Sequence, residues 1–156
     1  MKHARVLAKI AMRDSDGYPR HEAVKALNPA IQSDVLVKVA LFDGEGHVRE
    51  AAVLKLDTVK HARVLAKIAR RDSDDRVRKT AVHKLDPAAY GDVLEGIALT
   101  DSKTYVRVAA VRQLDPAING EELKRLAQTD NNSDVRRAAA EKLAASHLFP
   151  CPPGNL

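Results

Sequence analysis

A segment that opens with an aspartate recurs at a constant interval along the chain, and this repetition limits the possible folds more than any other feature. The third copy runs from Asp72 to Leu85 and reads DSDDRVRKTAVHKL. In every copy an arginine follows the aspartate by six residues, a leucine closes the segment, and the next copy begins 29 residues later. The aspartates are Asp14, Asp43, Asp72, Asp101 and Asp130, the arginines are Arg20, Arg49, Arg78, Arg107 and Arg136, and the leucines are Leu27, Leu56, Leu85, Leu114 and Leu143. A fixed period of about 20–50 residues is typical of a solenoid, in which small units stack in one direction.

Each period contains two helical patterns. In the third copy, Leu65, Ile68 and Ala69 occupy positions i, i+3 and i+4, which lie on one face of a helix. The second half of each period repeats apolar residues at i, i+4 and i+8, which also share a helical face. For the first copy these patterns predict one helix over residues 3–12 and a second over residues 19–27, joined by a polar turn.

The predicted fold class is therefore all-α, an α-solenoid of five 29-residue helical hairpins. A single hairpin cannot bury its apolar face alone, so a continuous core must form between stacked neighbours. Aromatic residues make up 3% of the chain and tryptophan is absent, so this core must be built from Leu, Val, Ile and Ala. The predicted repeats are 1–28, 29–57, 58–86, 87–115 and 116–144, followed by a tail over 145–156.

Proline marks most of the boundaries between repeats. The pairs Asn28-Pro29, Asp86-Pro87 and Asp115-Pro116 follow closing leucines, and proline cannot continue the preceding helix. The sequence leaves open whether residues 87–91 form a turn or the start of the next helix.

A longer period overlies the short one. The ten residues from Lys2 to Ala11 are identical to those from Lys60 to Ala69, two repeats further on. The net charges of the five repeats are +3, −2, +5, −1 and 0 in chain order. Duplication of a two-repeat block explains both the identity and the alternation.

The order of residues within a repeat carries a family resemblance. An aspartate, then Val-Arg five and six residues on, then small apolar residues and a closing leucine, resembles HEAT repeats, most closely the short bacterial, phycobilisome-lyase-like type. The resemblance covers residues 1–144 and implies the solenoid fold. It also implies that turn aspartates and second-helix arginines form a structural ladder between neighbouring repeats, carried by Asp14/Arg20, Asp43/Arg49, Asp72/Arg78, Asp101/Arg107 and Asp130/Arg136. The family includes scaffolds, lyase subunits and a DNA-glycosylase branch, so the resemblance implies no single function.

The constant aspartate–arginine spacing favours charge-assisted pairing over ligand binding for these arginines. Ligand contacts are expected instead at variable positions of the second helices that point away from the apolar face. In HEAT-like stacks these helices line the concave side. The candidate binding residues are His21, Lys25, Glu50, Leu54, Lys79, His83, Val108, Arg112, Arg137 and Glu141. Their mixed chemistry is typical of protein recognition.

The predicted function is a non-catalytic scaffold that binds another protein through this concave surface. One alternative is a nucleic-acid-binding solenoid that uses Lys25, Lys79, Arg112 and Arg137 with the basic repeats one and three. Nucleic acid is the weaker prediction because basic residues are spread over both helix faces and aromatics are few. A second alternative is a lyase-like enzyme subunit.

We expect no catalytic residues, cofactor or metal. The sequence contains no glycine-rich phosphate loop, no nucleophile elbow, and no His-x-x-x-His or Cys-x-x-Cys spacing. No apolar run approaches the roughly 18 residues of a membrane span, so we expect a cytoplasmic protein without membrane association.

Two features concern the ends of the chain. The first helix of repeat one is identical to an internal helix, so its outer edge is expected to expose apolar surface and to favour self-association, a docked partner, or a longer array. In the tail, Leu148 and Phe149 are expected to cap the last repeat, and Cys151 is a free thiol able to cross-link two chains. The partner, the oligomeric state and a natural or engineered origin are left open.

Overall fold

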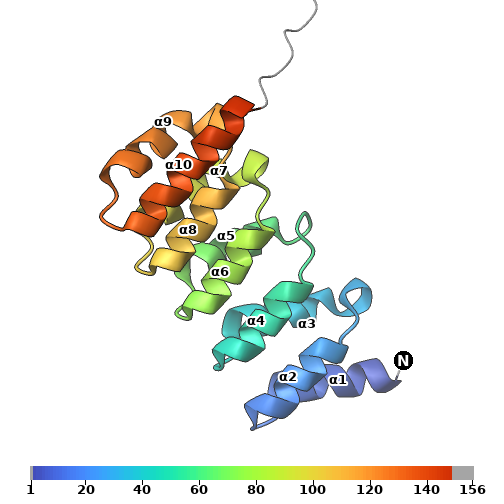
Figure 1. Ribbon diagram of the computed structural model, residues 1–156. Coiled ribbons are helices and arrows are strands. Elements are labelled where there is room, and N and C mark those ends of the chain that lie inside the picture. The colour runs from blue at the N-terminus through green and yellow to red at the C-terminus, as the bar shows by residue number, and fades with distance from the viewer. Residues whose placement is uncertain (1, 149–156) are drawn as a thin grey trace, which may run out of the picture. The chain divides into compact units, whose positions relative to one another are not determined.

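The structure, a computed structural model, describes residues 2–148, and all regular structure in that range is α-helical. The predicted all-α class is therefore confirmed for this range (Figure 1). The helices are α1 (Lys2–Arg13), α2 (Gly17–Ala26), α3 (Pro29–Phe42), α4 (Gly46–Lys55), α5 (Ala62–Arg71), α6 (Asp75–Lys84), α7 (Pro87–Thr100), α8 (Thr104–Gln113), α9 (Pro116–Thr129) and α10 (Ser133–Leu148). The predicted capping contact of Leu148 and Phe149 and the thiol of Cys151 lie outside what the structure describes.

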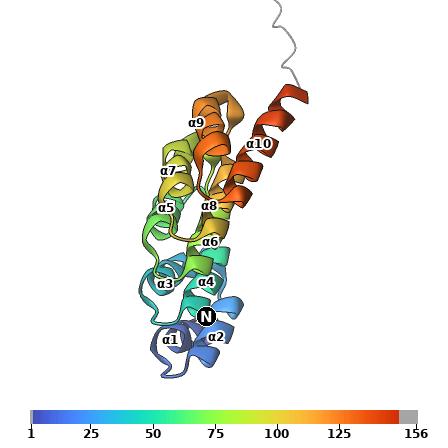
Figure 2. The ribbon, with the colours of Figure 1, turned by 60° about the vertical axis from the view of Figure 1, so that its left-hand side comes forward.

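The helices form hairpins in two compact units, which divide after Asp86. In the first compact unit, α1 pairs with α2, α3 with α4, and α5 with α6, and the second helices α2, α4 and α6 contact one another in that order. In the second compact unit, α7 pairs with α8 and α9 with α10, while α8 contacts α10 and α7 contacts α9. Within each unit, the first helices of the hairpins lie in one layer and the second helices in another (Figure 2).

The prolines start helices as well as separating repeats. Pro29 and Pro116 stand in the first turns of α3 and α9, where an N–H would have no partner within the helix. Asn28 caps α3 by accepting a hydrogen bond from the N–H of Ala30 at 3.0 Å. The segment that the sequence left undecided begins helix α7 at Pro87.

A break in helical geometry follows each of these starts at a repeat-equivalent position. Gln32, Tyr90 and Asn119 interrupt α3, α7 and α9 with φ values of −121°, −128° and −105°. In the third hairpin, which lacks the proline, His61 occupies the equivalent position just before α5. Sequence periodicity did not reveal these breaks.

Two of the side chains at these positions, those of Gln32 and His61, satisfy polar groups of the backbone. Gln32 is buried, and its side-chain oxygen accepts the N–H of Asn28 at 3.1 Å while its Nε2 donates to the carbonyl of Ala4 at 2.7 Å. Nδ1 of His61 accepts the N–H of Asp57 at 3.1 Å. The hydrogen bond to Ala4 ties α3 to α1, so the break also joins neighbouring hairpins.

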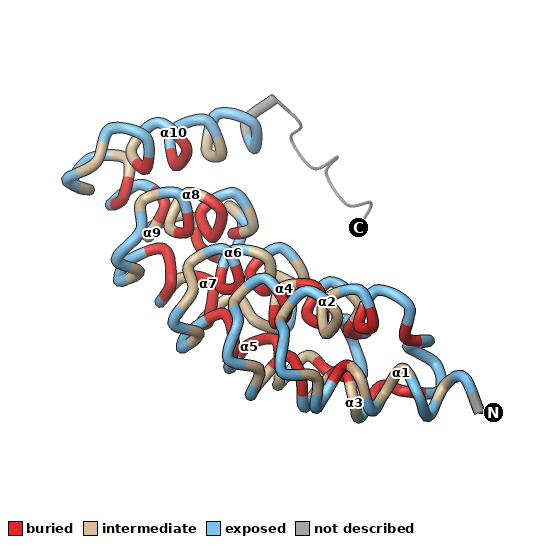
Figure 3. The backbone as a smooth tube through the Cα atoms, turned by 90° about the horizontal axis from the view of Figure 1, so that it is seen from below, coloured by how far each residue is buried: buried red, intermediate tan, exposed pale blue. Residues whose placement is uncertain are grey.

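The apolar faces that the sequence predicted lie between the helices. Leu65 and Ile68 of α5 are 0% and 3% exposed, and the closing residue Leu56 is 2% exposed. Figure 3 shows buried residues on the sides of helices that face a neighbour. Burial of each Leu or Ile side chain contributes about 1.5–3 kcal/mol, so these contacts dominate the stability.

Identical sequences are buried to different extents in α1 and α5. Leu7 and Ile10 are half-buried, although their counterparts in α5 are fully buried. Val6 of α1 is 56% exposed. The main contacts of α1 are with α2 and α3, and its side that carries Val6 is exposed.

We expect Leu65→Ala to lower the free energy of unfolding by roughly 2–5 kcal/mol, because it leaves a cavity in the core. Leu7→Ala is the matched control, since Leu7 lies in the same ten-residue sequence as Leu65 and is only half-buried. Urea unfolding followed by circular dichroism measures both. An equal loss for the two variants would contradict the assigned core.

Candidate binding surface

The repeated turn is held by its arginine. Nη1 of Arg20 donates to the carbonyl of Asp14 at 3.0 Å, within the same hairpin. Nε and Nη2 of Arg20 donate to the two carboxylate oxygens of Asp43, in the next hairpin, at 2.8 and 2.9 Å. Arg49 repeats this arrangement, with its two donors 2.9 and 2.7 Å from the carboxylate of Asp72. The bidentate geometry suits the planar guanidinium group.

The other members of the predicted ladder show parts of the same pattern. Nη2 of Arg107 donates to Asp130 at 3.3 Å, which joins the two hairpins of the second compact unit. Nη1 of Arg78, Arg107 and Arg136 donates to the carbonyl of the aspartate six residues earlier, at 2.9, 3.1 and 2.8 Å. Each of these arginines therefore binds the backbone carbonyl of the aspartate in its own hairpin. The described bonds to a carboxylate go instead to the aspartate of the following hairpin, 23 residues later in the sequence.

The position of Asp43 determines its ionisation. Its burial by itself raises the pKa of the carboxyl group, but the hydrogen bonds from Arg20 and from the N–H of Glu45, with the positive charges of Arg20 and Arg49, outweigh that effect. The pKa of Asp43 is therefore lowered, and the carboxylate is charged at neutral pH.

A second series of contacts, which the sequence analysis missed, joins the other ends of the second helices. Nζ of Lys55 donates to the carbonyl of Lys25 at 2.6 Å, and Nζ of Lys84 to the carbonyl of Leu54 at 2.9 Å. Lys142 donates to the carbonyl of Arg112 at 2.9 Å, again across 30 residues. Each lysine satisfies a carbonyl that the end of a helix leaves without an internal partner. A lysine directly before the closing leucine was the available sequence signal.

The predicted binding residues of the first compact unit lie along α2, α4 and α6. On α2, His21 is half-buried, with its Nδ1 3.3 Å from the carbonyl oxygen of His47 and the two rings 5.4 Å apart. Lys25 is exposed and forms an ion pair with Glu22 at 3.0 Å.

The remaining predicted residues of this unit differ in accessibility. On α4, Glu50 accepts a hydrogen bond from the hydroxyl of Thr80 at 2.8 Å, and Leu54 is 60% exposed. Lys79 and His83 are exposed on α6. These side chains lie on α2, α4 and α6, the second helices of three consecutive hairpins, and do not converge on one of the described cavities.

In the second compact unit the predicted residues do converge. Val108 and Arg112 of α8 and Arg137 and Glu141 of α10 line one hollow of about 320 Å³. Its wall is completed by Thr104, Tyr105, Asp134 and Ala138. These last four residues were not predicted from the sequence, although Thr104 and Asp134 precede predicted residues by four and three positions on the same helix.

The electrostatics of this hollow depend on Arg112. Arg137 is compensated, because its guanidinium lies 2.6 Å from Asp134 and 4.0 Å from Glu141. Arg112 is exposed, and no carboxylate within the described range forms an ion pair with its side chain. Tyr105 is 41% exposed beside it. The hollow therefore combines an uncompensated cation, an aromatic ring and the apolar surface of Val108.

Over residues 2–148, no group of three or more His, Cys, Asp or Glu side chains could hold a metal ion. Within the same part of the chain, no helix has both the length and the apolar character needed to cross a membrane.

Comparison of the chain with protein families, curated proteins and solved structures finds no match.

We expect Asp43→Asn to lower stability at pH 7 and to weaken its dependence on pH. Because the folded-state pKa of Asp43 is lowered, its contribution is present above the unfolded pKa of about 3.9 and is lost as pH falls through the folded value. The loss at pH 7 should be on the order of 1–3 kcal/mol, as for a buried hydrogen bond to a charged group.

Urea unfolding at pH 7 and pH 3 measures this difference. Asp14→Asn is the control, because in the described structure the Asp14 carboxylate accepts the N–H of Asp16 and no guanidinium. A difference between wild type and Asp43→Asn that stays constant from pH 7 to pH 3 would disprove the expectation.

Proposed function

We propose that this chain is a cytoplasmic, non-catalytic scaffold of the HEAT-like type, an α-solenoid of five 29-residue hairpins, which binds another protein through its second-helix surface. The observation that carries the proposal is the hollow between α8 and α10. Four positions selected from the repeat pattern meet there, although they come from two hairpins.

The chemistry of this hollow supports a protein partner. Tyrosine and arginine are enriched among the residues that contribute most to protein–protein binding, and Tyr105 and Arg112 lie together here. Val108 adds apolar surface, while Asp134 and Glu141 hold Arg137 in place. A partner with a carboxylate opposite Arg112 and an apolar group over Val108 fits this arrangement.

The ion pairs on this surface give less support to the nucleic-acid alternative. Of its four proposed cations, Lys25 pairs with Glu22 and Arg137 with Asp134. Nucleic-acid affinity depends on cations that replace counterions on phosphates, and a compensated cation contributes less to that exchange. The lyase-subunit alternative rests on the family resemblance alone.

Arg112→Glu tests the proposal, and Arg63→Glu is the matched control. Arg63 is exposed on α5, in the layer of first helices, so the charge change is the same on a different surface. Wild type and variants are immobilised and exposed to an extract of cells that express the chain, and bound proteins are quantified by mass spectrometry. We expect a partner that Arg63→Glu retains and Arg112→Glu loses at least ten-fold, with the loss then measured on the purified partner by calorimetry.

Equal retention of every bound protein by both variants would refute the second-helix surface as the binding site. Wild type, Arg112→Glu and Arg63→Glu are also titrated against labelled DNA and RNA from about 50 to 200 mM salt. Tight binding that falls steeply with salt would support the nucleic-acid alternative instead.

We also infer that the exposed side of α1 associates with a second copy of the chain. Ten residues of α1 are identical to residues 60–69, where Leu65 and Ile68 are core residues. Val6, Leu7 and Ile10 are less buried in α1 than their counterparts Val64, Leu65 and Ile68. An apolar surface of this kind favours association.

Val6→Lys should shift the chain towards monomer in sedimentation velocity at increasing concentration, because it places a charge in the contact. Val59→Lys is the control, since Val59 is 86% exposed in a turn outside this face. A wild-type protein that stays monomeric at high concentration would rule out the self-association.

A further inference from the structure

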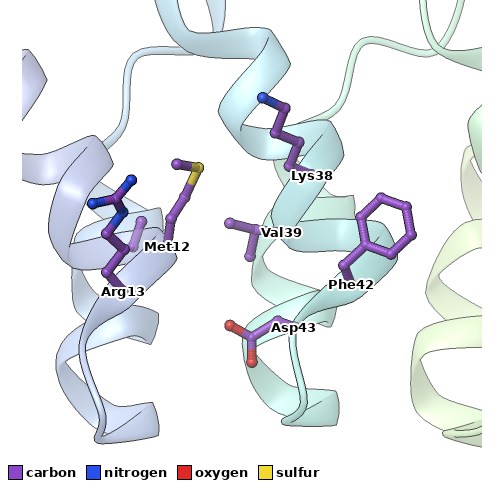
Figure 4. A pocket seen from close by; sticks show the side chains of 7 residues that line it. Met12, Arg13, Lys38, Val39, Phe42 and Asp43 are labelled. Carbon is purple, nitrogen blue, oxygen red and sulfur yellow. The ribbon is translucent and has the colours of Figure 1, made fainter.

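A second hollow lies in the layer of first helices, on the other side of the hairpins from the second-helix surface. It has a volume of about 350 Å³ and opens between α1 and α3 (Figure 4). The residues that line it include Ala11, Met12 and Arg13 from α1 and Lys38, Val39 and Phe42 from α3.

The floor of this α1–α3 hollow is apolar and adaptable. Ala11 and Val39 are 0% and 4% exposed, while the side chain of Met12 is 43% exposed. Figure 4 shows Met12 and Val39 on opposite sides of the gap, one on each helix. A methionine side chain is unbranched and polarizable, so Met12 can repack around an inserted apolar group.

The rim of the hollow carries positive charge without compensation. Arg13 on α1 and Lys38 on α3 are exposed, and neither forms an ion pair with a carboxylate of the described chain. Asp43 also borders the hollow, but its two oxygens are bound by Arg20. The two cations are therefore available to carboxylates from outside.

Phe42 extends the apolar surface beyond the hollow. It ends α3 and is 76% exposed. Covering such a side chain contributes about 1.5–3 kcal/mol. A single exposed apolar residue needs no explanation, but this one adjoins an apolar hollow and two unpaired cations.

The next hollow along the same layer provides an internal comparison. Between α3 and α5, the repeat-equivalent residues Ala40, Leu41, Lys67, Ile68, Arg71 and Asp72 enclose about 90 Å³. Lys67 corresponds to Lys38, but Ile68 is one methylene larger than Val39, and Arg71 replaces the exposed Phe42. The two hollows lie at equivalent positions of the repeat. Of the two, the α1–α3 hollow has the space for an inserted side chain and an aromatic residue at its edge.

We propose that the α1–α3 hollow docks an acidic segment of a partner protein. The segment inserts one apolar side chain between Met12 and Val39 and places carboxylates against Arg13 and Lys38. Charge complementarity selects an acidic segment, and the apolar floor between two helices suits a side chain that anchors it. This site is independent of the second-helix surface.

The test uses the full chain and a fluorescein-labelled ten-residue peptide with one leucine and one phenylalanine between two pairs of glutamates. Binding is followed by anisotropy at about 50 mM salt. We expect Lys38→Glu to weaken binding at least ten-fold, and Lys67→Glu, its counterpart in the narrow hollow, to change it less than two-fold. Lys38→Gln removes the charge without reversing it and should reduce peptide affinity to an intermediate extent. It replaces Lys38→Glu in the test if that variant does not fold.

The location of the peptide is read from Met12. The chain has two methionines, Met1 and Met12, so a ¹³C-methyl methionine spectrum is simple, and Met12→Leu assigns the signal. The Met12 signal should shift during the titration. A control peptide with serines in place of leucine and phenylalanine should bind at least five-fold more weakly.

Three results would overturn the proposal. The first is no saturable binding up to about 1 mM protein, and the second is equal weakening by Lys38→Glu and Lys67→Glu. The third is an unchanged Met12 signal in the bound state. Arg112→Glu should leave the peptide-induced shift of the Met12 signal unchanged. Binding of the same acidic peptide at the second-helix surface would be lost in Arg112→Glu and would not move Met12, so the two sites are distinguished.

Discussion

In both compact units a guanidinium group joins neighbouring hairpins, and the positions of α2, α4 and α8 depend on that bond. Arg20 and Arg49 each bind the carbonyl of their own turn and the carboxylate of the next one. The carbonyl bond sets where the second helix begins, and the carboxylate bond sets its distance from the following hairpin. Because the fork of donors is planar and rigid, this contact also fixes orientation, which a lysine could not do.

The lysine series acts at the opposite ends of the same helices. Lys55 and Lys84 bind carbonyls at the end of the preceding second helix. Each second helix is thus held at its start by an arginine and near its end by a lysine. The side chains between these anchors are left to vary, and this is where Val108 and Arg112 lie in the hollow of the second compact unit.

Much of this arrangement was predictable from the repeat. The period predicted paired helices, the apolar residues predicted which faces are buried, and the variable positions selected four residues of one hollow. The breaks at Gln32 and its equivalents were not predictable, because the side chain is satisfied by the carbonyl of Ala4, 28 residues away. The hollow between α1 and α3 was missed for the same reason: its residues come from two helices, and its space depends on how those helices pack.

Two identical segments separate what the local sequence determines from what tertiary packing determines. Lys2 to Ala11 and Lys60 to Ala69 have the same local preferences, and both are largely helical. Yet Leu65 is fully buried and Leu7 is not, because burial depends on neighbouring helices that the segment itself does not encode. The sequence alone determined the helices, their apolar faces and the aspartate–arginine spacing, since these follow from backbone geometry and local chemistry. Only the tertiary structure decided which apolar faces stay open and which repeated position becomes a hollow, since both depend on how distant segments pack together.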